Sequence, residues 1–377
     1  MTHESEQQLI AWRRELHSWP ELSGQEVETT ARLRRWLQQA DIRLADYPLE
    51  TGVVAEVGQG NTLIALRADI DALPVHEATG LSYRSRNSGV MHACGHDIHS
   101  AVMLGAALQL KAQEDRLPGR VRLLFQPAEE NATGARRLIG AGVLANVQAI
   151  FGMHNEPSLP VGHFATRAGA FYANADKFVV RVQPAPGSDS ILIASQIIQA
   201  LQSLTSRSFN TLDSLVLSVT RITAQKASPA DAGEAEFGGT VRTHDAQVRA
   251  GLAQRAQQIA EAVAAASGAR ATFSWHPGPP VLINDARWAQ FASEVAQQAG
   301  YQVQTAELHL GGEDFAYYLQ HVPGAFVSIG SASAFGLHHG GFNPDEALIA
   351  PAARYFSQLA QQALQQLAAR CPDSLLN

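Results

Sequence analysis

The stretch NTLIALRADID, residues 61–71, begins with a continuous apolar run and ends in two aspartates. Three further apolar runs resemble it: GVVAEVG (52–58), VRLLFQPA (121–128) and VQAIFGMHN (147–155). Continuous rather than alternating apolar character is expected for strands that are buried on both faces of a sheet. Helical stretches lie between these runs, such as SAVMLGAALQLKAQ (100–113) and TGARRLIGAG (133–142). The alternation predicts an α/β fold with a mostly parallel sheet.

The middle of the chain has a different pattern. Between residues 175 and 280 the predicted order is strand, helix, strand, strand, helix, strand, which is the ferredoxin-like unit. The first pattern resumes after it, and 377 residues are many for a single hydrophobic core. We therefore expect a discontinuous α/β domain, residues 1–174 and 281–377, with an α+β domain, residues 175–280, inserted into it.

Composition and charge exclude several classes of protein. A net charge of -7 leaves no basic stripe for nucleic acid. No apolar run is long enough to span a membrane, and the polar N-terminus does not resemble a signal peptide. The two cysteines, Cys94 and Cys371, do not form a disulfide framework, so we expect a cytoplasmic protein.

Polar side chains follow the predicted strands. RADID (67–71), QPAEE (126–130), GMHN (152–155) and LHHGGFNPDE (337–346) each come after an apolar run, and MHACGHDIHS (91–100) precedes a helix. Open α/β sheets bind ligands beyond the carboxyl ends of their strands. We therefore expect these segments to meet at one edge of the sheet.

The residue types in these segments indicate a metal site. Cys94 and His96 lie two residues apart, and Glu130, His154 and His338 complete a set of thiolate, imidazole and carboxylate donors. Such a set suits Zn²⁺, Mn²⁺, Co²⁺ or Ni²⁺ better than Ca²⁺ or Mg²⁺.

The adjacent carboxylates Glu129 and Glu130 point to hydrolysis. Two neighbouring negative charges repel each other unless a cation lies between them. We assign Glu130 as a ligand and Glu129 as the general base that takes a proton from a metal-activated water. His92 and His99 are expected to support the ligands or to cap the helix.

At these residues the sequence resembles the M20 metallopeptidase family. The segments RADIDALP, MHACGHDIHSAVMLGAA, QPAEE, GMHN, GGEDFAYYL and LHH match the subgroup of amidohydrolases that cleave N-acyl amino acids, such as hippurate hydrolase and auxin-conjugate hydrolases. The resemblance implies two divalent metal ions, with the ligand set and the base named above, and His338 rather than His339 as the last ligand. It also implies that Asp69 supports the site and that Glu313, in GGEDF, is a conserved acid of unassigned role.

The inserted domain resembles the family's lid and dimerisation domain, which implies a homodimer. Relatives carry a GKGGHAAxPH-like stretch whose histidine reaches the partner's site, whereas this chain has PAPGSDS (184–190) there, without a histidine. Three histidines elsewhere are candidates to replace it: His163, His244 and His276. Arg242 is expected either to bind the carboxylate of the substrate or to be an exposed arginine of a strand.

Three functions compete. The first is a metal-dependent amidohydrolase acting on a small N-acyl amino acid. The second is a catalytically weakened or non-catalytic metal-binding homologue, because the lid histidine is missing. The third is a hydrolase with Cys94 as nucleophile and His96 as its base.

Overall fold

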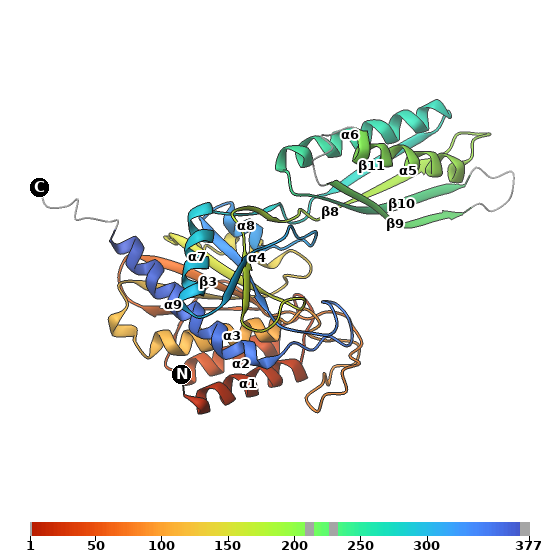
Figure 1. Cartoon of the computed structure of the whole chain (residues 1–377). Helices are drawn as coiled ribbons and strands as arrows, with labels where there is room; N and C mark the ends of the chain where they lie inside the picture. Colours follow the sequence, from red (N-terminus) through yellow and green to blue (C-terminus); the bar gives the residue numbers. More distant parts are fainter. Residues whose placement is uncertain (1, 208–214, 226–232, 370–377) are drawn as a thin grey trace, which may run out of the picture. The chain divides into compact units, whose positions relative to one another are not determined.

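The computed structural model describes residues 2–207, 215–225 and 233–369 of the chain (Figure 1). These residues form two compact units, which we describe separately. The first unit comprises the described residues up to Gly169, Asn284–Glu307 and those from Tyr317 onward. The second comprises the described residues within Ala170–Ile283 and the short segment Leu308–Ala316.

An eight-stranded sheet forms the centre of the first unit. Its strands, in spatial order, are β1 (Arg43–Ala45), β2 (Val53–Gly58), β4 (Arg120–Gln126), β3 (Leu63–Asp69), β5 (Ala149–Glu156), β14 (Gly324–Gly330), β6 (His163–Thr166) and β13 (Gln302–Thr305). The central strands β4, β3, β5 and β14 pair in parallel, whereas β2 and β6 pair with their inner neighbours antiparallel. Every residue of β3 is buried. The expected α/β fold with a mostly parallel sheet is therefore confirmed.

Helices cover this sheet and close its core. They are α1 (His3–Ser18), α2 (Val27–Gln39), α3 (His96–Lys111), α4 (Gly134–Gly140), α7 (Ala286–Gln298) and α9 (Ile349–Ala368), with the short turns η1 (Glu114–Arg116) and η2 (Glu346–Leu348). Helix α3 packs against α1, α9 and β3 (Figure 1), and its side chains are buried on nearly all sides. Among the described helices, none combines the length and the apolar character that a membrane crossing requires.

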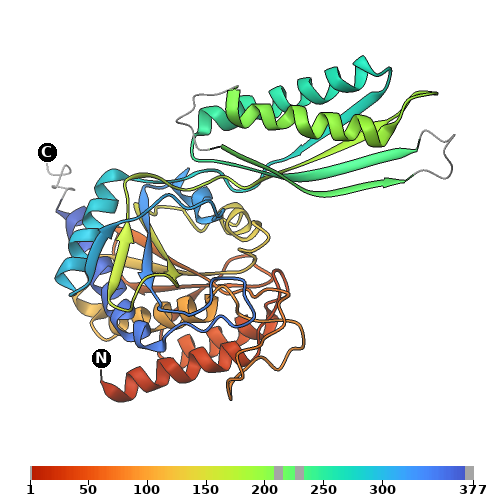
Figure 2. The ribbon, with the colours of Figure 1, turned by 45° about the vertical axis from the view of Figure 1, so that its right-hand side comes forward.

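The second unit contains an antiparallel four-stranded sheet. Its spatial order is β11 (Arg270–His276), β8 (Asp176–Gln183), β10 (Glu234–Thr243) and β9 (Leu215–Gln225). Helices α5 (Ser190–Arg207) and α6 (Ala246–Ala266) lie side by side on one face of it (Figure 2) and share its apolar core. Along the chain the elements follow one another as strand, helix, strand, strand, helix, strand, in the order that the sequence predicts. Two short strands, β7 (Gly169–Tyr172) and β12 (Leu282–Asn284), pair where the chain enters and leaves this unit.

The segment Leu308–Ala316 groups with the second unit, although the predicted boundaries assigned it to the α/β domain. His309 exchanges backbone hydrogen bonds with Phe171 and Ala173, and its ring lies 4.5 Å from that of Tyr172. Periodicity within the sequence gives no sign of these long-range bonds. Helix α8 (Phe315–Leu319) then leads the chain back to the first unit.

Candidate metal centre

The predicted ligands come from four parts of the first unit. Cys94 lies in the turn before α3, and His96 is the first residue of that helix. Glu130 follows β4, His154 lies near the end of β5, and His338 lies in the loop after β14. Because β4, β5 and β14 point the same way, their carboxyl ends meet at one edge of the sheet.

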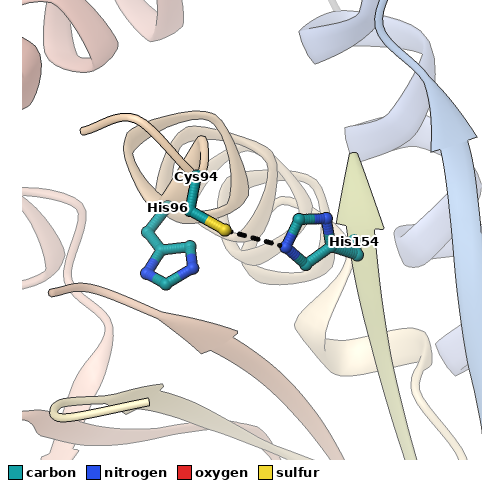
Figure 3. A group of neighbouring side chains, drawn as sticks. All are labelled: Cys94, His96 and His154. Atoms are coloured by element: carbon teal, nitrogen blue, oxygen red, sulfur yellow. Dashed lines mark hydrogen bonds between the residues drawn. The ribbon is translucent and has the colours of Figure 1, made fainter. Parts of the chain in front are cut away.

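The ligand atoms of these residues lie close together. Cys94 Sγ is 3.3 Å from His154 Nε2 (Figure 3), and His338 Nε2 is 3.5 Å from Glu130 Oε1. The atoms fall into three groups, each within 4.8 Å: Cys94, His96 and His154; Cys94, Glu130 and His338; and His96, Glu129 and Glu130. The predicted base Glu129 therefore lies among the predicted ligands.

Hydrogen bonds at the Nδ1 atoms of two imidazoles fix the orientation of the rings. His96 Nδ1 is 2.9 Å from the main-chain oxygen of Asp71 and 3.2 Å from its Oδ1. His154 Nδ1 donates to the main-chain oxygen of Asn155 at 2.8 Å. Both rings therefore turn Nε2 toward the site, as metal-ligating histidines do when their other nitrogen is hydrogen-bonded.

Two buried atoms of the site lack a hydrogen-bond partner among the described residues. They are His96 Nε2 and Glu130 Oε1, which lie 3.9 Å apart. Buried polar atoms without a partner are costly, so each calls for an explanation. A divalent cation between them provides one, and the mixture of thiolate, imidazole and carboxylate fits a metal such as Zn²⁺ or Mn²⁺.

The pKa shifts indicate an excess of negative charge. Burial raises the pKa of the Cys94 thiol, and the charges of Glu130 and Glu129 raise it further. Burial also raises the pKa of Glu130 to about 7. Burial would lower the pKa of His96, but Asp69 and Asp71 outweigh it and raise that pKa to about 10. A bound dication relieves this crowding of carboxylates and allows the thiol to ionise.

Of the residues expected to support the site, His99 and Asp69 have hydrogen-bond partners, whereas His92 has none among the described residues. His99 donates from Nδ1 to Asp69 Oδ1 at 2.6 Å, so its Nε2 is the acceptor that receives two N–H groups of Asn155, each at 3.0 Å. Asp69 also bonds Arg67 at 2.7 Å. His92 is buried, and neither of its ring nitrogens has a partner among the described residues.

Two supporting residues were not singled out from the sequence. Asp71 accepts from the main-chain N–H of Glu130 at 3.0 Å, and it also holds His96. Asn155 bonds both Cys94 and His99. Their signals were faint: Asp71 lies two positions after Asp69, on the same side of an extended chain, and Asn155 adjoins His154.

The two histidines of LHH lie in different surroundings. His338 adopts a φ of 65°, which is rare for a residue with a side chain, and its Nε2 lies near Glu130. The ring of His339 instead stacks on Phe335, with centroids 4.5 Å apart.

The remaining predicted residues lie mostly in the second unit. Arg242 donates from Nη1 to the main-chain oxygen of Leu310 at 2.7 Å. Glu313 is buried and accepts from the N–H of Phe315. Of the three candidate replacements for the lid histidine, His163 begins β6 in the first unit, His244 donates to His309, and His276 is exposed at the end of β11.

Comparison with known proteins places the chain among hydrolases. Residues 65–362 match the profile of the peptidase family M20/M25/M40. The chain is 44% identical over 370 residues to an N-acetylcysteine deacetylase of Bacillus subtilis (strain 168), and the alignment covers 95% of this chain and 97% of that protein. It is 35% identical over 339 residues to the IAA-amino acid hydrolase ILR1-like 2 of Arabidopsis thaliana, and this alignment covers 85% of this chain and 76% of that protein.

A solved structure shares the whole fold. The crystal structure of a dinuclear metal-binding peptidase of the M20 family from Bacillus subtilis matches with a TM-score of 0.89 and 43% identity. The match covers 97% of this chain and 99% of that one.

Proposed function

Because this chain belongs to the peptidase family M20/M25/M40, we propose that it is a metal-dependent amidohydrolase that removes the acyl group from a small N-acyl amino acid. The observation that carries the proposal is the convergence of a thiol, three imidazoles and two carboxylates at one sheet edge. The names of two relatives support the substrate class, since one deacetylates N-acetylcysteine and the other hydrolyses IAA-amino acids.

In this proposal five residues hold two divalent cations: Cys94, His96, Glu130, His154 and His338. The donor set favours Zn²⁺, Mn²⁺, Co²⁺ or Ni²⁺. When bound, such cations polarise the scissile carbonyl and lower the pKa of a water molecule. Glu129 takes the proton from the attacking water and returns it to the departing amine. Arg242 binds the substrate carboxylate, because a guanidinium offers a planar pair of N–H donors.

The division of labour between Glu129 and Glu130 is the sharpest test. Glu129→Gln keeps the ligands and removes proton transfer, so we expect kcat to fall about 100- to 10,000-fold with metal content unchanged. Glu130→Gln removes a ligand, so we expect the metal content itself to fall. Elemental analysis and steady-state kinetics on N-acetyl amino acids measure both effects. Equal metal loss in the two variants would contradict the assignment.

A metal-binding protein without catalysis is the second candidate, and the histidine-free segment 184–190 favours it. Loss of one donor to the developing oxyanion costs about 100- to 1,000-fold in turnover. We therefore expect slow turnover and a narrow substrate range. A screen of N-acetyl and N-benzoyl amino acids with Mn²⁺, Co²⁺, Ni²⁺ or Zn²⁺ decides it, since a kcat above about 10 per second would show that the histidine is dispensable.

Catalysis by the Cys94 thiol is less well supported. Its neighbour at 3.3 Å is His154 rather than the expected His96. Reactive cysteines have lowered pKa values, whereas burial raises the pKa of Cys94. A metal chelator separates the two mechanisms, because it abolishes metal-dependent hydrolysis and leaves a thiol nucleophile active.

We further propose that the chain forms a homodimer through its second unit. Strand β9 lies at the edge of the four-stranded sheet, and Ile222 on it is 52% exposed. Ile191 and Leu192, in the first turn of α5, are also exposed. Edge strands readily pair with a second copy. Light scattering at micromolar concentration checks this, and a monomer would contradict it.

We also propose a cytoplasmic location, because the proposed site needs Cys94 as a free thiol.

A further inference from the structure

One buried amide side chain connects several of the segments that carry the ligands. Asn155, in β5, is fully buried. Its Nδ2 donates to the main-chain oxygen of Cys94 at 2.7 Å and to His99 Nε2 at 3.0 Å. Its Oδ1 accepts from the hydroxyl of Ser331 at 3.1 Å, where the loop toward His338 begins.

The main chain of the same residue acts on the neighbouring ligand. The carbonyl oxygen of Asn155 accepts from His154 Nδ1, which places the proton on that nitrogen and leaves Nε2 as the donor atom for a metal. The N–H of Asn155 donates to His99 Nε2 at 3.0 Å. Asn155 therefore influences both His154 and the turn before α3.

The turn between Cys94 and His96 is shaped to the Asn155 side chain. Gly95 adopts a φ of 89°, a conformation that favours glycine. A Cβ at Gly95 would also collide with the amide group of Asn155. The close approach of this amide thus helps to fix the turn that separates the two ligands.

The amide cannot be replaced by a carboxylate without loss. His99 donates its only proton, on Nδ1, to Asp69, so its Nε2 accepts. Cys94 offers a carbonyl oxygen, which also accepts. Both partners need N–H donors, and only an amide of this shape supplies two of them together with an acceptor for Ser331.

We propose that Asn155 is a positioning residue of the metal centre. Its amide holds the turn of Cys94 and the ring of His99, which packs against the ring of His154 with centroids 4.8 Å apart, so that Cys94 Sγ and His154 Nε2 bind one cation together. The inference rests on the function proposed above. It goes beyond the ligand set because Asn155 contacts no metal itself and acts through the residues that do. Supporting residues of this kind typically contribute about 10- to 100-fold to metal affinity.

The chain offers a matched control in Asn284. This asparagine is also buried in the first unit, and its Nδ2 donates to Thr166, Arg167 and Phe326, while its Oδ1 accepts from the N–H of Phe326. Asn155→Asp and Asn284→Asp therefore remove buried amide donors from equally well-bonded sites. Only the first lies beside the predicted ligands.

The experiment is a Co²⁺ titration of the metal-free full-length proteins. The near-ultraviolet charge-transfer band reports the Co²⁺–thiolate bond. Competition with a chelator gives the affinity, and urea unfolding of the metal-free proteins gives the stability. For Asn155→Asp we expect about 10- to 100-fold weaker Co²⁺ binding and a weakened thiolate band. For Asn284→Asp we expect a comparable loss of stability, with Co²⁺ affinity within about 3-fold of the native protein.

Native affinity and spectrum in Asn155→Asp, or an equal loss of affinity in Asn284→Asp, would overturn the inference. If Asn155→Asp does not fold, Asn155→Ser tests the same bonds with a smaller side chain, and it must also weaken Co²⁺ binding. A native protein that binds no Co²⁺ would instead contradict the proposed metal-dependent function.

Discussion

Two consecutive residues, His96 and Asp97, begin the same helix and point into two different buried polar clusters. His96 belongs to the cluster of predicted ligands and base, which we name the metal-ligand cluster and define as Cys94, His96, Glu129, Glu130, His154 and His338. Asp97 belongs to the arginine cluster, defined as Arg13, His17, Glu77, Asp97 and Glu346. In it, Arg13 Nε lies 2.8 Å from Asp97 Oδ2, and His17 lies between Asp97 at 2.7 Å and Glu77 at 3.2 Å.

The clusters differ in where their positive charge comes from. Arg13 is fully buried and supplies a permanent cation to Asp97 and to Glu346. The metal-ligand cluster contains two carboxylates, a thiol and three imidazoles, and it has no arginine or lysine among its members. We therefore interpret the arginine cluster, which contains a permanent cation, as a structural element, and we propose that the metal-ligand cluster is a binding site for an added cation. This contrast can be tested by removing each cation in turn.

The largest effect on stability is expected from the arginine cluster. Arg13→Met removes the guanidinium and leaves Asp97 buried without its permanent cation, with His17 still 2.7 Å away. Breaking a buried pair on one side costs about 3 to 5 kcal/mol. The free energy of unfolding, measured with urea on the metal-free protein, should fall by that amount.

Arg14 is the control for this substitution. It bonds the same partner, Glu346, at 2.6 Å, but its side chain is 47% exposed. Exposed ion pairs contribute about 1 kcal/mol or less, so Arg14→Met should change the stability little. Equal losses in the two variants would show that burial does not distinguish these arginines.

The next effect comes from adding a divalent cation, which we expect to bind the metal-ligand cluster. A ligand at 100 times its dissociation constant stabilises the folded state by about 2.7 kcal/mol. We expect Mn²⁺ or Zn²⁺ to raise the urea midpoint of the chelator-treated protein, and EDTA to reverse the gain. The gain should shrink in Glu130→Gln. Unfolding curves that coincide with and without metal would contradict the comparison.

Much of the fold was predictable because burial leaves a strong pattern in sequence. The continuous apolar runs identified the central strands, and the polar residues at their ends identified the sheet edge at which the predicted ligands meet. The assignment of these residues as ligands stays a prediction. It followed from residue type and family resemblance rather than from periodicity.

What the sequence did not reveal depends on contacts between distant residues. Asp71 and Asn155 hold the ligands through hydrogen bonds that span 25 to 61 positions, and no local pattern encodes such bonds. The same is true of Leu308–Ala316, which joins the second unit through backbone bonds to Phe171 and Ala173. Arg13 was not singled out from the sequence, yet it is fully buried.

The smallest effect is a difference in pH dependence between the clusters. Burial raises the pKa of Glu130 from 4.5 to about 7, so the folded metal-free protein holds a proton that the unfolded chain releases. Its stability therefore falls as the pH rises from about 4.5 to 7. Burial would also raise the pKa of Glu77, but hydrogen bonds from His17, Thr79 and the N–H of Ser85 lower it to about 2. The stability that the ionised Glu77 contributes to the folded protein is therefore present above pH 4.5 and is lost as the pH falls toward 2.

Substitutions can distinguish these two opposite pH dependences of stability. In metal-free protein, Glu130→Gln should remove a decline on the order of 2 kcal/mol between pH 4.5 and 7, because glutamine does not titrate. Saturating Mn²⁺ should remove the same decline in the native protein, since the cation stabilises the carboxylate form. Glu77→Gln should leave that range unchanged and alter only the acid limb. Urea unfolding at half-unit pH intervals measures these slopes. A metal-free protein whose stability rises between pH 5 and 7, and does so equally in Glu130→Gln, would show that Glu130 is already neutralised by a group of the protein, and the contrast between the clusters would then fail.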